Sequence, residues 1–140
     1  MACTYRCLFG ITKRPPIVSA DASFKTFHKG RSYLCTSGPD NKMYLFGFFK
    51  NDEVTIHKEI PRYTAAEADS LIAEYADDPL FQGLTFGDLC KEHTSMTLVP
   101  LEEYVLEKSF YKRAVLVGDS FHKVCLSPCA IHTCSSLFSR

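Results

Sequence analysis

The chain has 140 residues, of which 46% are hydrophobic and 23% charged, values typical of one globular domain that can bury a core of its own. Its 16 Lys and Arg residues balance its 16 Asp and Glu residues, so the net charge favours neither nucleic acid nor an anionic membrane as a partner. The sequence has no membrane-spanning apolar run and no signal-peptide pattern, and we therefore expect a cytoplasmic protein without a membrane segment.

The first half of the chain predicts an antiparallel sheet. Four segments rich in β-branched and aromatic residues predict strands: Tyr5–Ile11, Ser32–Thr36, Met43–Lys50 and Val54–Lys58. Turn-forming residues separate the last three, at 37–42 and at Asn51–Asp52, and this spacing predicts a meander. The stretch 44–49 is aromatic on both faces of its strand, so we expect it inside the sheet with cover on each side.

Two helices and a further strand follow. Thr64 and Glu67 form a capping-box pattern, and the apolar spacing after it predicts a helix over Ala65–Ala76. The stretch Thr85–Asp88 predicts the start of a second, shorter helix. Met96–Leu101 predicts a strand that Pro100 interrupts.

The stretch "RAVLVGDSFHKV" combines a strand pattern with a candidate ligand-binding group. Its unalternating apolar run predicts a strand over Arg113–Val117 that is buried on both faces. Gly118 and Asp119 follow directly, which places a carboxylate where the strand opens into a loop. Open sheets bind ligands at such strand ends.

Four stretches together resemble one enzyme family: "YRCLFGIT", "IPRYTAAEAD", "LVPLEEYVLEK" and "RAVLVGDSFHK". Their order and spacing are similar to those of fungal FAD-dependent monooxygenases of the aromatic-hydroxylase flavoprotein class. The most similar group serves meroterpenoid and indole-diterpene pathways and epoxidises prenyl chains. The resemblance spans roughly residues 5 to 123.

The resemblance implies FAD as the cofactor and a terpenoid or aromatic small molecule as the substrate. It implies that Gly118 and Asp119 bind the ribityl chain of FAD, and that Arg6, our one candidate catalytic residue, lies near the substrate. Phe27 occupies a position where relatives commonly have a tyrosine with a proposed catalytic role. The family also allows membrane association of full-length relatives.

Several family features are absent from the sequence. It contains no GxGxxG motif, which binds the FAD pyrophosphate in relatives, and no glycine-rich stretch after Lys123. We therefore expect a truncated monooxygenase that is inactive alone. Its fold class would be α+β, with a substrate-domain-like region over 1–112, a partial FAD-binding element over 113–123 and a divergent tail over 124–140. The element's strand would then lie at the margin of the fold, with incomplete cover for Val115 and Val117.

Two alternatives remain open, a cofactor-free binding or isomerase-type protein of the same pathway and a small zinc-binding interaction module. The zinc alternative rests on the crowded tail: His122, Cys125, Cys129, His132 and Cys134. Because these residues contain no paired Cys-x-x-Cys motif, we expect no metal site. The cysteines Cys7, Cys35 and Cys90 have apolar neighbours, which favours buried thiols. Glu102 and Glu103 are adjacent on a strand and would face opposite ways, which argues against an acid–base pair.

Overall fold

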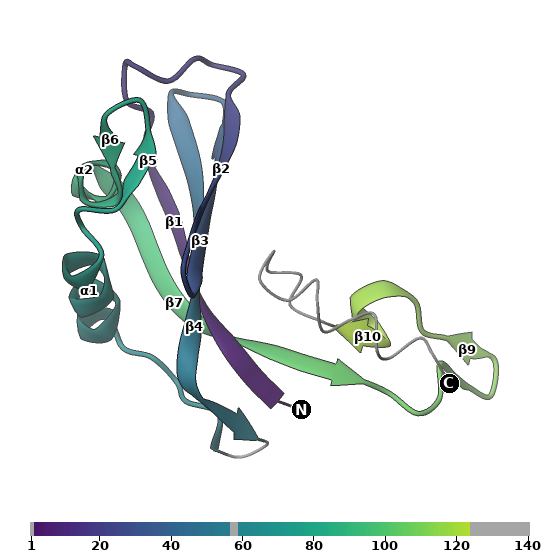
Figure 1. The fold of residues 1–140 in the computed structure, drawn as a ribbon. Helices are drawn as coiled ribbons and strands as arrows, with labels where there is room; N and C mark the ends of the chain where they lie inside the picture. The colour runs from purple at the N-terminus through teal and green to yellow at the C-terminus, as the bar shows by residue number, and fades with distance from the viewer. Residues whose placement is uncertain (1, 57–58, 124–140) are drawn as a thin grey trace.

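A computed structural model describes residues 2–56 and 59–123. One six-stranded sheet forms the body of the protein, with every neighbouring pair antiparallel and the strand order β10-β7-β1-β4-β3-β2 (Figure 1). Its strands are β1 (Ala2–Lys13), β2 (Ser23–His28), β3 (Arg31–Ser37), β4 (Lys42–Ile56), β7 (His93–Val105) and β10 (His122–Lys123). The expected mainly antiparallel α+β architecture is confirmed.

The predicted turn at Asn51–Asp52 is wrong. Strand β4 continues through both residues to Ile56, and its pairing with β1 shifts register between Cys3 and Tyr5. The two polar residues therefore lie in an irregular stretch of one long strand, where a bulge accommodates them without reversing the chain. Lys58, the expected end of a separate strand, lies outside the described residues.

Strand β7 also departs from expectation, because it runs through Pro100 without a break. Pro100 pairs with Arg6 of β1, whereas β10 pairs only with Tyr104 and Val105. Among the described strands, none pairs with the other side of β7 at Pro100, and proline is tolerated at such an edge position because its missing N–H need not take part in the ladder. Strand β2 was not predicted; its alternation of half-buried and exposed residues is clear only in the structure.

Both predicted helices are present. Helix α1 (Ala65–Glu74) begins with a reciprocal capping box between Thr64 and Glu67, and α2 (Phe86–Lys91) begins with a second one between Thr85 and Asp88. Each box satisfies backbone donors that a helix start leaves unpaired. Between the helices lies a short hairpin of β5 (Pro79–Phe81) and β6 (Leu84–Thr85).

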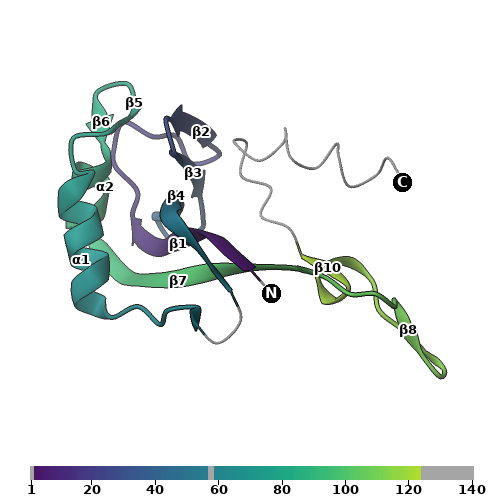
Figure 2. The same cartoon turned by 60° about the horizontal axis from the view of Figure 1, so that its bottom comes forward.

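The two helices cover one face of the sheet (Figure 2). The buried cluster on this side joins strands and helices, and includes Leu8, Leu45, Phe49, Leu71 and Phe86. We call the opposite side the outer face; by register it carries Cys7, Phe9, Phe27, Ser32, Leu34, Phe46, Phe48 and Val99. Strand β4 lies inside the sheet as expected, but only its helix-facing residues are fully buried, and those on the outer face are half-buried. The expected cover on each side is therefore complete on the helix-facing side and partial on the outer face.

Residues 106–121 form an arm that extends from the end of β7 (Figures 1 and 2). The arm holds a minimal hairpin of β8 (Phe110–Tyr111) and β9 (Ala114–Val115), followed by the 3-10 turn η2 (Gly118–Ser120). The expected doubly buried strand over Arg113–Val117 is wrong, since only two of its residues pair. The expected incomplete cover is confirmed: Val115 is 70% and Val117 76% exposed.

No helix among residues 2–56 and 59–123 is long and apolar enough to cross a bilayer.

Candidate functional site

Gly118 and Asp119 lie together on the arm, in the turn η2. Gly118 has a φ of +61°, and nothing lies within 4 Å of the position that a Cβ would occupy. Glycine is favoured there by its backbone conformation, and a ligand could approach the backbone closely. The Asp119 carbonyl accepts a hydrogen bond from the Tyr104 hydroxyl at 2.7 Å. This bond fixes the backbone of the turn on strand β7, while the Asp119 residue is exposed to solvent.

Arg6, the candidate catalytic residue, lies on the helix-facing side of β1. It lines a cleft of about 190 Å³ together with Tyr63, Glu67, Ser70, Leu71, Glu74 and Leu98. Its Nε is buried and has no hydrogen-bond partner among the described residues. Burial raises the pKa of the Tyr63 phenol, and the nearby Arg6 charge opposes that shift. Arg6 therefore lies under α1, whereas Asp119 lies on the arm, and the described residues do not bring the two together.

The outer face carries an aromatic surface. The rings of Phe9 and Phe46 are in contact, with centroids 5.0 Å apart. In the next row of the sheet, Phe27, Ser32 and Phe48 are cross-strand neighbours. Phe27, which stands where relatives commonly have a tyrosine, is 55% exposed. The face can therefore contact an apolar ligand. Its residues can be assigned to one surface only from the register of five strands.

A polar clamp that the sequence analysis missed joins β3 to the connection after α1. Arg31 donates from Nε and Nη2 to the two carboxylate oxygens of Asp78 at 2.5 and 2.6 Å, and the Tyr33 hydroxyl donates to the same carboxylate at 2.6 Å. Arg31 and Tyr33 lower the pKa of the Asp78 carboxyl. Burial, followed by the hydrogen bond to Asp78, raises the pKa of Tyr33.

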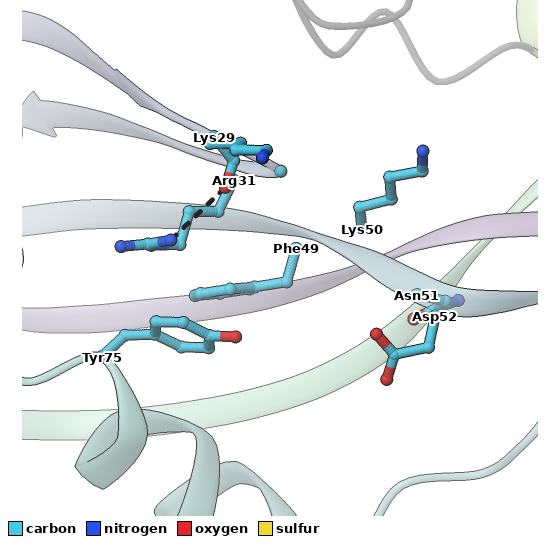
Figure 3. Close-up of a pocket in the computed structure, with 8 residues that line it drawn as sticks. Lys29, Arg31, Phe49, Lys50, Asn51, Asp52 and Tyr75 are labelled. Carbon is cyan, nitrogen blue, oxygen red and sulfur yellow. Dashed lines mark hydrogen bonds between the residues drawn. The ribbon is translucent and has the colours of Figure 1, made fainter.

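Figure 3 shows the cleft beside this clamp, which has a volume of about 400 Å³. The Arg31 guanidinium lies 4.7 Å from the centre of the Tyr75 ring, and the Phe49 ring lies 5.1 Å from Tyr75. Asp78 neutralises the Arg31 charge, and Phe49 is 2% exposed. Because Arg31 and Phe49 both contact Tyr75 at the end of α1, the clamp and its rings stabilise the packing of α1 on the sheet. The sequence positions of its ion pair are 47 residues apart, so no local motif could have indicated it.

The cysteine and metal expectations have different outcomes. The prediction of buried cysteines at Cys7, Cys35 and Cys90 is confirmed, and Cys3 is buried as well. Burial raises the pKa of Cys35 and of Cys90 to about 12, which keeps these thiols protonated and unreactive. Within residues 2–56 and 59–123, no group of three potential ligands could hold a metal. Of the residues behind the zinc alternative, all except His122 lie outside the described part of the chain.

Glu102 and Glu103 lie next to each other on β7. The Thr4 hydroxyl donates to the Glu103 carboxylate at 3.0 Å, so this carboxylate has a partner from β1.

Comparison with known proteins identifies a set of curated relatives. The FAD-dependent monooxygenase asqG of Emericella nidulans is 44% identical over 124 residues, which cover 89% of this chain and 22% of the relative. The FAD-dependent monooxygenase spyC of Aspergillus fumigatus is 32% identical over 145 residues, which cover 100% of this chain and 30% of the relative. The FAD-dependent monooxygenase ausM of Aspergillus calidoustus is 31% identical over 123 residues, which cover 88% and 27%.

No protein-family model and no solved structure matches the chain. The chain spans less than a third of the length of each of the three relatives. Its homologues are fungal FAD-dependent monooxygenases, as the four sequence stretches predicted, and the chain corresponds to one segment of them.

Proposed function

We propose that this chain provides the substrate-side segment of an FAD-dependent monooxygenase that oxygenates a terpenoid or aromatic compound in fungal secondary metabolism. The observation that carries the proposal is the 44% identity over 124 residues to the asqG monooxygenase. In the proposed division, residues 1–112 form the substrate-binding region, 113–123 touch the flavin and 124–140 are a divergent tail.

The geometry of η2 fits a contact with the ribityl chain of FAD. Asp119 is exposed, so its carboxylate can accept hydrogen bonds from sugar hydroxyls. Gly118 leaves the backbone beside it open to approach. When bound, FAD supplies the redox and oxygen chemistry, while the protein binds, orients and excludes water.

The outer face is the proposed wall of the substrate cavity. Phe9, Phe46 and Phe48 present half-buried rings there, and apolar walls of this kind exclude water from a reacting centre. Arg6 remains a proposed catalytic residue. Its side chain lies on the helix-facing side of β1, opposite the outer face, so a catalytic role for Arg6 would place the reacting group in the cleft beside Tyr63 and not against the outer face.

Asp119 alone cannot hold FAD tightly. A hydrogen bond to one charged group contributes about 1–3 kcal/mol, whereas micromolar binding needs about 8 kcal/mol. Titration of the purified chain with FAD should therefore give no saturable change in flavin fluorescence at micromolar concentrations. Stoichiometric binding that Asp119→Ala abolishes would overturn this division and indicate a self-sufficient flavoprotein.

Segment exchange tests the proposal itself. The part of the asqG monooxygenase that matches this chain is replaced by residues 2–123, and substrate-dependent NADPH oxidation is measured. We expect turnover and an oxygenated product. A folded, FAD-loaded exchange protein that forms no oxygenated product would contradict the substrate role of this segment.

A further inference from the structure

The side chain of Ser32 carries a buried hydroxyl group. The residue is 2% exposed, and its Oγ has no hydrogen-bond partner among the described residues. Buried polar atoms in native proteins are almost always paired, so an orphaned one indicates a missing partner such as a ligand. The hydroxyl is thus a second observation, independent of the apolar character of the outer face.

The surroundings of Ser32 define what could reach it. On the outer face, Ser32 pairs in register with Phe27 of β2 and Phe48 of β4. Phe27 is 55% exposed, so the row that contains Ser32 meets solvent at this residue, and a ligand would reach the hydroxyl by displacing the Phe27 ring. Two rows further along the same face, the hydroxyls of Ser23 and Thr36 lie 3.0 Å apart and bond each other. The Ser32 hydroxyl therefore differs from the Ser23 and Thr36 hydroxyls on the same face, which have hydrogen-bond partners.

We propose that the Ser32 hydroxyl binds the oxygen of an aromatic ligand, a phenol or aryl carbonyl, that lies on the outer face between Phe27 and Phe48. This inference rests on the proposed function, since it takes the outer face as the substrate wall. Ser32 would then determine specificity: it favours ligands with an oxygen at this position over pure hydrocarbons, because a ligand without the oxygen leaves the hydroxyl unpaired.

A purely structural serine would behave differently. If Ser32 had a partner within the protein, Ser32→Ala would break that bond and lower the melting temperature. If the hydroxyl is kept for a ligand, its removal relieves an unsatisfied buried group. The variant should then melt at the same temperature as the wild type or a few degrees higher, and lose affinity for the ligand.

The test compares 2-naphthol with naphthalene, two ring systems that differ by one hydroxyl. Binding to the full 140-residue chain is followed by the fluorescence anisotropy of the naphthalene ring, and the chain contains no tryptophan that would interfere. We expect the wild type to bind 2-naphthol at least fivefold more tightly than naphthalene. Ser32→Ala should bind both within a factor of two, through weaker binding of 2-naphthol.

Ser37→Ala is the matched control on the same strand. The Ser37 hydroxyl donates to the Ser19 carbonyl at 2.8 Å, so this variant should melt lower and keep the preference for 2-naphthol. The proposal is overturned if the wild type shows no preference or binds neither compound, if Ser32→Ala keeps the preference, or if Ser32→Ala lowers the melting temperature. No flavin takes part, so these outcomes are separate from a failure of FAD binding.

Discussion

Replacement of Asp78 by alanine should destabilise the protein more than any surface change. The substitution removes the carboxylate that accepts two hydrogen bonds from Arg31 and one from Tyr33. The side chain of Asp78 is 11% exposed and that of Arg31 is 25% exposed. The variant therefore leaves a largely buried guanidinium and a buried phenol without their partner. Loss of one member of a buried pair costs about 3–5 kcal/mol, a large share of the about 5–15 kcal/mol that keeps a domain folded.

Urea unfolding followed by far-UV circular dichroism measures this loss. The control is Glu92→Ala, which breaks an ion pair with Lys13 whose side chains are 66% and 64% exposed. Exposed pairs contribute about 0–1 kcal/mol, so the control should unfold near the wild-type midpoint. If Asp78→Ala unfolds at the same urea concentration as Glu92→Ala, the clamp does not stabilise the fold and the reasoning fails.

The clamp also predicts an acid dependence. Arg31 and Tyr33 lower the pKa of Asp78 in the folded state, so the stabilisation is complete above the ordinary carboxyl pKa of about 4 and is lost as the pH falls through the lowered value. The difference in unfolding free energy between wild type and Asp78→Ala should therefore narrow below about pH 4. A difference that stays constant down to pH 2 would contradict the charge assignment.

Three further changes test separate parts of the fold. Thr64→Ala removes the cap of α1 and should cost about 1 kcal/mol in urea unfolding; an unchanged midpoint would contradict the role of the capping box. Gly87→Ala would place a Cβ 2.9 Å from the Cβ of Ala76 and 3.0 Å from its carbonyl oxygen, and should cost about 1–3 kcal/mol. A Gly87→Ala protein as stable as the wild type would show that this contact relaxes freely. The double variant Val115→Asp, Val117→Asp removes exposed apolar surface from the arm, and should reduce self-association in analytical ultracentrifugation without lowering the melting temperature. Equal self-association of the wild type and the double variant would show that the arm is not the surface through which the protein associates.

Local sequence signals predicted the elements that local interactions stabilise. Both capping boxes lie within four residues of sequence, and both helices start where Thr64 and Thr85 predict. The aromatic stretch 44–49 predicted an interior strand for the same reason, since its pattern is contained in the strand itself.

The failures arise where a distant partner decides the structure. Asn51 and Asp52 have turn chemistry, but β4 continues through them, and Lys50 and Thr55 on either side pair with β1. Pro100 is tolerated in β7 because no other described strand pairs with β7 on the side away from β1 at this residue. The apolar run at Arg113–Val117 predicts burial that the described residues do not supply.

The candidate site divides in the same way. Gly118 and Asp119 form a contiguous motif, and their position on a turn after a strand was predicted from sequence alone. Ser32, Phe27 and Phe48 become neighbours only through the register of β2, β3 and β4. The sequence could not indicate this surface, because no spacing within the chain shows which faces of three strands point the same way.

The most direct test of the central claim is the amount of FAD bound to the asqG exchange protein with and without the Asp119 carboxylate. Three proteins are purified: the exchange protein, its Asp119→Ala variant and its Asp21→Ala variant. The Asp21→Ala variant is the control, because it loses an exposed carboxylate elsewhere. FAD affinity is then measured by fluorescence titration. A loss of about 1–3 kcal/mol corresponds to roughly 5- to 150-fold weaker binding, and we predict a loss in this range for Asp119→Ala alone. Equal FAD affinity in all three proteins, or a folded exchange protein that binds no FAD, would contradict the assignment of this segment to a flavin-dependent monooxygenase.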